Sequence, residues 1–261
     1  MKTSREMANN WRANTTVLLA MLLLSTSVPI SALGQDAINE SREKRAQTGF
    51  KFLAVSVHPR AAALGNAMTA VEGDAWTLFY NPAGMAAQTA QISTTFGITQ
   101  WIAGIDYNAA AISFRPFRGR LGVFGLSVRA VDYGSIQGTI RADNDQGFLD
   151  TGTLEPTALS VGLGYARALT DRFSIGGRVK FATQDLGSTA LSGTISDGVF
   201  TADEFSDDKL DVFAFDFGML YKTGFRSLTF AVAATNFSEE IEFVDESFQL
   251  PLTLRIGVSM N

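Results

Sequence analysis

The stretch Phe173–Phe181 reads FSIGGRVKF and shows the pattern that decides the fold. Large apolar side chains occupy alternate positions, and small or polar side chains occupy the positions between them. The first set is Phe173, Ile175, Val179 and Phe181, and the second set is Ser174, Gly176, Arg178 and Lys180. Because successive side chains of a β-strand point to opposite faces, the stretch predicts a strand with one apolar and one polar face.

The same alternation recurs in about eight segments between residue 91 and the last residue. They are predicted at 91–99, 105–115, 121–133, 157–167, 173–181, 213–221, 228–237 and 252–260. The connections alternate between short and long, and the long ones are 134–155 and 187–209. This pattern is typical of an antiparallel transmembrane β-barrel, in which strands need about 9–11 residues to cross and one end has only short turns.

Aromatic residues gather near the predicted strand ends, as in the interfacial girdles of such barrels. They are Trp101, Tyr107, Phe114, Phe117, Tyr133, Phe173, Tyr221 and Phe225. Charged residues lie mid-strand on the polar face and are predicted to line the lumen, since a charge facing lipid there is costly. They are Arg129, Arg178, Lys180, Asp216 and Arg255. The alternative architecture is a periplasmic β-sandwich, whose two apolar faces would meet each other.

The N-terminus is predicted to be an export signal. Residues 1–34 combine a basic leader, a short apolar core at 17–24 and small residues before a cleavage point after Gly34. The core is too short for a transmembrane helix, which needs about 20 residues. Residues 35–48 are polar and are predicted to be a flexible periplasmic leader. Without a spanning helix, a membrane location requires a closed barrel, so we expect the outer membrane of a Gram-negative-type envelope.

Composition argues against several classes of function. The chain has no cysteine and one histidine, His58, so Cys–His catalysis and histidine-rich metal sites are excluded. We expect no enzyme activity, no cofactor and no metal. The net charge is −5, and residues 1–34 carry three basic and one acidic side chain, so the mature chain is near −7. An acidic chain without a basic stripe is a poor candidate for nucleic-acid binding.

Residues 49–87 lack sustained alternation and contain short motifs in a fixed order. Gly49–Leu53 reads GFKFL, Arg60–Gly65 reads RAAALG, Leu64–Ala67 reads LGNA, Asp74–Ala75 reads DA, and Asn81–Gly84 reads NPAG. This ordered set resembles the N-terminal hatch of the FadL-like outer-membrane barrels, and more closely that of the PorV/PorQ family. The specific likeness covers residues 49–86; over the strands it is one of pattern. The resemblance makes 49–87 the hatch and 88–261 the barrel.

The resemblance also marks hatch residues, namely Gly65, Asp74, Asn81, Pro82, Ala83 and Gly84. The local chemistry agrees, because Asn81 is pushed out of helical geometry by Pro82, whose own φ is fixed. The side chain of Asn81 is expected to bond to nearby backbone and close the turn. We therefore expect a rigid corner that leads from the hatch into the wall.

Size is inconsistent with a complete small barrel. FadL-like barrels have about 14 strands, whereas about eight are predicted here. An eight-stranded barrel is filled by its own side chains and has no room for a hatch of about 40 residues. The polar faces of 157–167 and 228–237 carry mostly small residues, which suits a wide barrel that encloses a plug. We expect that the sequence is a truncated copy of a longer barrel, incomplete at its C-terminus.

Two roles follow from the resemblance. The first is a non-enzymatic accessory or scaffold barrel in protein secretion of the type IX kind, with secretion-system proteins or secreted cargo as partners. The alternative is a FadL-like channel for uptake of hydrophobic small molecules. The hatch is common to both, so it does not distinguish them, although the polar inward residues slightly disfavour a purely apolar channel. Outer-membrane lipid is the expected partner in either case, and nucleic acid in neither.

Overall fold

The structure is a computed structural model that describes residues 48–141, 145–196, 199–243 and 246–260. The predicted signal peptide and nearly all of the predicted leader, residues 1–47, lie outside the described residues. The residues described here belong to one compact unit.

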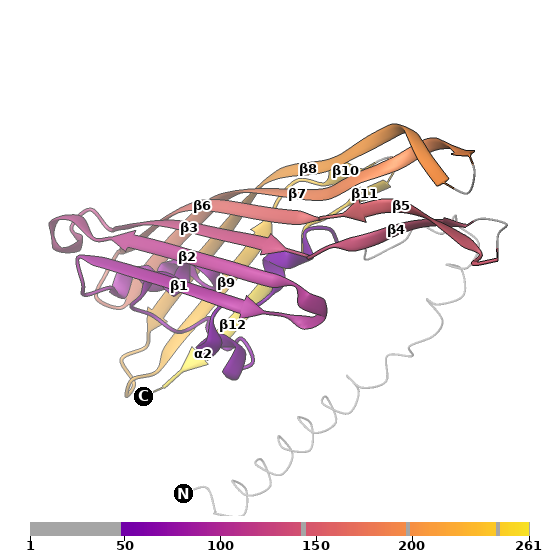
Figure 1. Ribbon diagram of the computed structural model, residues 1–261. Coiled ribbons are helices and arrows are strands. Elements are labelled where there is room, and N and C mark those ends of the chain that lie inside the picture. Colours follow the sequence, from indigo (N-terminus) through magenta and orange to yellow (C-terminus); the bar gives the residue numbers. More distant parts are fainter. Residues whose placement is uncertain (1–47, 142–144, 197–198, 244–245, 261) are drawn as a thin grey trace, which may run out of the picture. The chain divides into compact units, whose positions relative to one another are not determined.

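Most of this unit is a single antiparallel sheet of eight strands (Figure 1). In spatial order the strands are β1 (Ile92–Gln100), β2 (Asp106–Phe114), β3 (Val123–Asp132), β6 (Thr157–Ala168), β7 (Phe173–Ser196), β8 (Val199–Lys222), β9 (Thr229–Phe237) and β12 (Thr253–Ser259). The all-β prediction is confirmed, since each predicted alternating segment is a strand of this sheet. Within the described residues β1 and β12 are edge strands that do not pair with each other, so the sheet is open.

The two long connections, 134–155 and 187–209, consist largely of β-strand. Residues 134–155 contain the hairpin β4 (Ile136–Arg141) and β5 (Phe148–Leu154), which forms its own two-stranded sheet. Most of 187–209 belongs to β7 and β8, which continue as one long hairpin with register shifts. Backbone pairing needs no apolar alternation, so these polar extensions give no period-two signal. A third pair, β10 (Ile241–Phe243) and β11 (Glu246–Phe248), lies between β9 and β12.

The connections differ strongly between the two ends of the sheet. Three short links lie at one end, which we call the tight-turn end: 115–122, 169–172 and 223–228. The first of them contains η6 (Pro116–Gly119). The other end has a short link through η5 (Ile102–Gly104), but it also has the β4–β5 hairpin, the distal part of β7–β8 and the β10–β11 hairpin. We call it the hairpin end. The antiparallel order places these two groups of connections at opposite ends.

Residues 49–88, which we call the inner segment, pack on one face of the sheet. They contain η2 (Lys51–Ala54), α2 (Pro59–Ala63), η3 (Ala75–Phe79) and η4 (Pro82–Ala87). The ring of Trp76 lies close to Gly97 of β1, and Thr69 lies close to Gly257 of β12. Because one short segment touches both edge strands on the same face, the sheet must curve around it, as Figure 1 shows.

Candidate functional site

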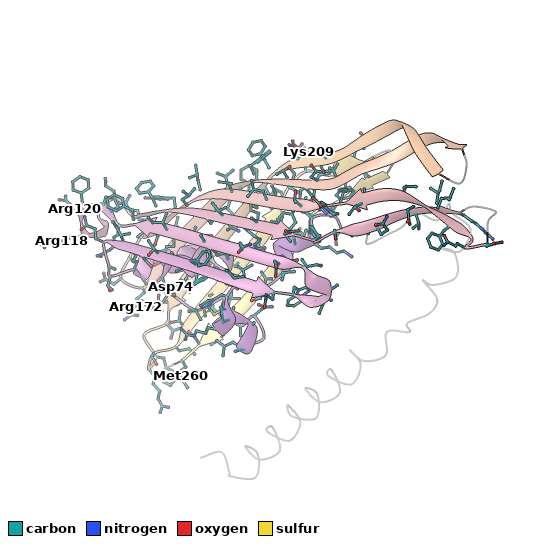
Figure 2. All side chains as sticks on the ribbon, viewed as in Figure 1. Asp74, Arg118, Arg120, Arg172, Lys209 and Met260 are labelled. Atoms are coloured by element: carbon teal, nitrogen blue, oxygen red, sulfur yellow. The ribbon has the colours of Figure 1, made fainter. Side chains whose placement is uncertain are left out.

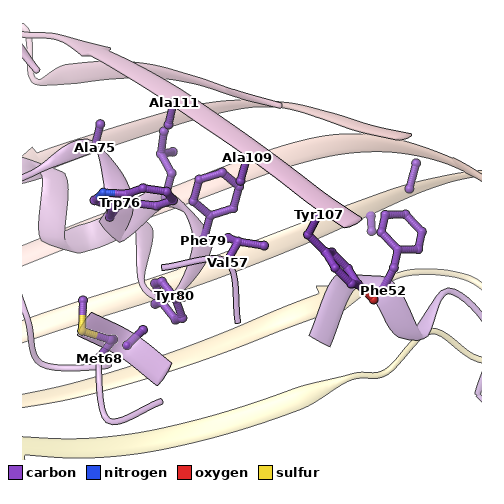
Figure 3. Close-up of a cluster of buried hydrophobic side chains, with 14 of the residues drawn as sticks. Phe52, Val57, Met68, Ala75, Trp76, Phe79, Tyr80, Tyr107, Ala109 and Ala111 are labelled. Atoms are coloured by element: carbon purple, nitrogen blue, oxygen red, sulfur yellow. The ribbon is translucent and has the colours of Figure 1, made fainter. Parts of the chain in front are cut away.

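The contact between the inner segment and the sheet is the best-packed part of the described chain. Leu78 and Met85 of the inner segment are fully buried. Ala109 and Ala111 of β2 point toward the aromatic rings around Trp76 (Figure 3), and their small side chains leave room for those rings. Full burial of each large apolar side chain contributes roughly 1.5–3 kcal/mol. The inner segment is therefore the core that holds one face of the sheet.

Asn81 joins the inner segment to β8. Its Oδ1 accepts a hydrogen bond from the backbone N–H of Ala83 at 3.1 Å and so caps η4. Its Nδ2 donates to the backbone carbonyls of Thr69 at 2.7 Å and Met219 at 3.3 Å. Asn81 is completely buried. The side chain bonds to nearby backbone as the turn chemistry of Asn81 predicts, and it also reaches a strand far away in the sequence.

The close approach of η4 requires glycine in the sheet. A Cβ atom at Gly218 would lie 1.9 Å from Oδ1 of Asn81. A Cβ atom at Gly176 would lie 2.5 Å from the backbone of Pro82 and Ala83. Gly176 and Gly218 are direct cross-strand partners in β7 and β8. The predicted Asn-Pro-Ala corner therefore rests on a flat spot made by two paired glycines.

A buried ion cluster lies next to this spot on the same face of the sheet. Arg178 Nε donates to Asp216 Oδ2 at 2.6 Å, and Lys180 Nζ donates to Asp216 Oδ1 at 2.7 Å. Arg178 lies directly opposite Asp216 in the β7–β8 register. Their exposed fractions are 8% for Arg178, 2% for Lys180 and 0% for Asp216. Charges this deeply buried are tolerated only when paired and hydrogen-bonded, so the three side chains form one unit.

A β-bulge in β9 completes the cluster. Thr235 and Asn236 together oppose the single residue Asp216, because the register of β8 and β9 shifts at this point. Asn236 adopts a left-handed φ of 65°, and its backbone N–H donates to Asp216 Oδ1 at 2.7 Å. Its side-chain oxygen accepts a hydrogen bond from Lys180. Bulges commonly re-aim a side chain in this way.

Two arginines hold the inner segment electrostatically. Arg129 Nη1 donates to the backbone carbonyl of Phe52 at 2.8 Å. The guanidinium carbon of Arg129 lies 5.4 Å from the centroid of the Phe79 ring, and that of Arg178 lies 5.5 Å from the same centroid. Both distances are within the range of cation–π interactions. Arg255 is half-buried and donates to Thr235 Oγ1 at 3.2 Å. All five lumen-predicted residues thus face the inner segment, and four of them lie in or beside the cluster.

The remaining hatch residues have different places. Gly84 is buried, and a Cβ atom there would lie 2.8 Å from the backbone oxygen of Val71. Gly65 is exposed and follows α2 with φ +59°, a conformation that favours glycine. Asp74 is half-buried at the start of η3. The structure therefore brings Asn81, Pro82, Ala83 and Gly84 together against the sheet and places Gly65 and Asp74 elsewhere.

His58, the single histidine, lies in the inner segment. Its ring stacks on Trp76 with the centroids 4.5 Å apart. Burial lowers the pKa of His58 below its ordinary 6.5, Asp74 opposes this shift and Arg60 reinforces it. The Nδ1 atom of His58 and Oδ1 of Asp74 are buried and have no hydrogen-bond partner among the described residues. The environment therefore favours the neutral imidazole.

The space left between the inner segment and the sheet is small. Two cavities of about 10 Å³ each share Leu53, Phe79, Arg129 and Arg178 in their linings. A cavity of this size holds about one water molecule. Neither of these two cavities has room for a larger solute.

The opposite face of the sheet is apolar and uncovered (Figure 2). Its exposed fractions reach 68% at Phe96, 62% at Leu163 and 60% at Phe213. Further exposed members of this face are Ile112, Phe124, Leu126, Val161, Ile175, Val179, Phe215, Phe217, Leu254, Ile256 and Val258. A water-soluble monomer rarely exposes a contiguous apolar patch of more than a few hundred Å². The sheet thus has buried charged groups on the face that packs against the inner segment and exposed large apolar side chains on the other face.

Sequence reasoning missed Phe79, Asn236 and the backbone of Phe52 as partners of the ion cluster. One signal for the bulge was available, because Phe237 is out of phase with Phe230 and Val232 in an otherwise alternating strand. Nothing in the sequence pairs Phe79 with Arg129 and Arg178, which are contributed by distant strands.

No protein-family model matches this chain, and a search of curated proteins finds no match either. Among the described residues, no helix has the length and hydropathy that a membrane-crossing helix requires. Over the same part of the chain, no three histidine or acidic side chains are grouped closely enough to hold a metal ion.

Proposed function

We propose that this chain is a non-enzymatic outer-membrane β-barrel of the PorV/PorQ type, with the inner segment as its hatch, and that it serves as an accessory or scaffold component in protein secretion of the type IX kind. The single observation that carries the membrane part is the reversed polarity of the sheet. Arg178, Lys180 and Asp216 are buried under the inner segment, while Phe96, Leu163 and Phe213 are exposed on the other face. This arrangement suits lipid outside and an enclosed interior.

Closure of the wall is part of the proposal. In lipid, the unpaired N–H and C=O groups of an edge strand each cost several kcal/mol. The edges β1 and β12 must therefore be paired in the membrane, either with each other or through further strands. A wall wider than eight strands suits an interior that contains the inner segment, because an eight-stranded barrel has room only for its own side chains.

Two features favour a scaffold over a conduit. The inner segment packs closely on the sheet, with Leu78 and Met85 fully buried, and the two cavities described above each hold about one water. The hairpin end carries three β-hairpins, whereas the links at the opposite end are short. Long structures on one side are typical of the outer loops of such barrels, and loops held by a rigid scaffold commonly bind partners.

One observation favours the alternative, a FadL-like channel for hydrophobic small molecules. A cleft of about 640 Å³ lies beside η6 at the tight-turn end. Its lining combines Phe114, Pro116 and Phe117 with Arg115 and Arg118. This volume falls in the range of small-molecule sites, and the mixed lining suits an amphipathic anion.

Deletion of the gene in the source bacterium separates the two roles. Loss of secreted cargo with normal growth on fatty acids or alkanes supports the secretion role, and the reverse result supports uptake. Normal secretion together with normal growth on both carbon sources contradicts both roles.

A second test concerns the hatch. An Asn81→Ala/Pro82→Ala variant should reach the outer membrane in normal amount but lose the secretion or uptake phenotype, because the corner that attaches η4 to β8 is removed. A variant that inserts and also complements the deletion fully would show that this corner has no functional part. An exposed change at the other end of the inner segment, Ala62→Ser, is the matched control and should complement.

A further inference from the structure

The tight-turn end of the sheet carries a dense band of basic side chains. All three of its connections contribute, and the flanking strand ends add two more. The members are Arg115, Arg118, Arg120, Arg167, Arg172, Lys222 and Arg226. Figure 2 shows Arg118, Arg120 and Arg172 toward this end and Lys209 toward the other. We call these seven residues the basic band.

Most of the basic band is free to bind an external anion. Among the described residues, the only ion pair in it is Lys222 Nζ with Glu72 Oε1 at 2.8 Å. Arg115 is half-buried, and its Nη1 donates to the backbone carbonyl of Thr89 at 3.3 Å. The other five arginines are exposed, and the links of this end contain one exposed carboxylate, Asp171. The arginines therefore outnumber the carboxylate, and this excess of positive charge at one end of an acidic protein is not explained by folding.

Large apolar side chains alternate with the arginines on the same turns. Phe117 is 73% exposed next to Arg118, and Phe225 is 65% exposed next to Arg226. The Arg226 guanidinium carbon lies 5.5 Å from the Phe225 ring centroid. Leu121 and Leu169 are also exposed there. Such a mixture suits a membrane interface, where rings lie at the boundary and long basic side chains extend to the headgroups.

The hairpin end has the opposite charge. Its described residues include Asp106, Asp132, Asp150, Glu155, Asp185, Asp211, Glu239, Glu240 and Glu242, against the cations Arg141, Lys209 and, in the adjoining η2, Lys51. The two ends of the sheet therefore have electrostatic potentials of opposite sign. A membrane with anionic headgroups attracts the tight-turn end and repels the hairpin end.

We infer that the basic band is a contact surface for anionic phospholipid headgroups and that it sets which end of the sheet lies at the phospholipid leaflet. This inference rests on the membrane location proposed above and adds the ligand class and the orientation. Each Lys or Arg near an anionic bilayer surface strengthens attraction by roughly five-fold. An acidic protein surface is the competing occupant, and it predicts equal uptake by the two vesicle types.

The test uses the full mature chain refolded into vesicles of phosphatidylcholine alone or with phosphatidylglycerol, separated from unbound protein by flotation. We expect the anionic vesicles to take up the chain at a lipid concentration at least ten-fold lower, and the difference to shrink at 1 M salt, where charges are screened beyond about 3 Å. Arg118→Gln/Arg120→Gln should lower this preference by up to roughly 30-fold at low salt, if the two effects multiply.

The matched control is Arg141→Gln/Lys209→Gln, which removes two exposed cations at the hairpin end. It should keep the preference for anionic vesicles. Equal uptake by both vesicle types, or equal loss in both double variants, overturns the headgroup contact while leaving the membrane location intact. Failure to enter either vesicle type overturns the membrane location itself.

Discussion

The buried ion cluster offers the sharpest test of how the inner segment and the sheet hold each other. Asp216 accepts hydrogen bonds from Arg178, from Lys180 and from the backbone N–H of Asn236. Asp216→Ala leaves two cations with exposed fractions of 8% and 2% without their carboxylate. Removing one partner of a buried pair costs about 3–5 kcal/mol. We expect the free energy of unfolding to fall by at least that lower value, because two cations are affected.

The assay is equilibrium unfolding in urea with the chain inserted in vesicles, followed by tryptophan fluorescence. Trp76 lies in the inner segment and should report its release. The control is Arg178→Met/Lys180→Met/Asp216→Leu, which removes the whole cluster. Replacing a buried ion network by apolar residues of similar volume is often neutral or stabilising, so this variant should recover most of the loss. A loss below about 1 kcal/mol for Asp216→Ala would refute the cluster as a buried, coupled unit.

The other predictions concern the glycine contact, the outer face and the histidine. Gly218→Ala should lower the free energy of unfolding by about 1–3 kcal/mol, since its Cβ would displace Asn81, whereas Gly177→Ala, whose Cβ meets its nearest atom at 3.6 Å, should be tolerated. Leu163→Arg should reduce insertion into vesicles by about 2–4 kcal/mol if the outer face meets lipid, and a neutral result would contradict that location. Because the pKa of His58 is lowered by burial, the unfolded chain binds more protons just below pH 6.5. Stability should therefore be complete above pH 6.5 and decline as pH falls, and His58→Gln should show a flatter pH profile between 5 and 7.

The sheet was predictable from the sequence because alternation is a local property. In β3 (Val123–Asp132), alternation alone puts Phe124 and Leu126 on one face and Ser127 on the other with Arg129, which was predicted to face the lumen; in the structure the first two are exposed and the last two are buried. The distal part of β7–β8 was not predictable in this way. Its sequence mixes small and polar residues with a few apolar ones, such as Ile195 and Phe200, at irregular spacing, so no period marks it as a strand. Its pairing depends on the neighbouring strand rather than on a local pattern.

The candidate site was predictable only in part. The turn at Asn81 and Pro82 was predictable, because the restriction that Pro82 places on Asn81 and the hydrogen bonding of the Asn81 side chain both act on adjacent residues. The contact of Asn81 with Met219 spans 138 residues and has no local signature. The same applies to the two glycines beneath η4. From the sequence alone, Gly218 could be any small residue of a strand. Only the structure shows that the Asn81 side chain lies against it and leaves no room for a Cβ atom.

The reach of the inner segment constrains the order of assembly. It contacts β1 through Trp76 and β12 through Thr69, and the anchor of Asn81 lies on β8. These attachment points lie on strands that come early and late in the described part of the chain. The inner segment precedes all three strands, so it can take its final position only after β8 and β12 have been synthesised, and until then its aromatic rings are exposed. Contacts this distant in sequence make folding slow, so an engineered cross-link between Thr69 and β12 should speed folding.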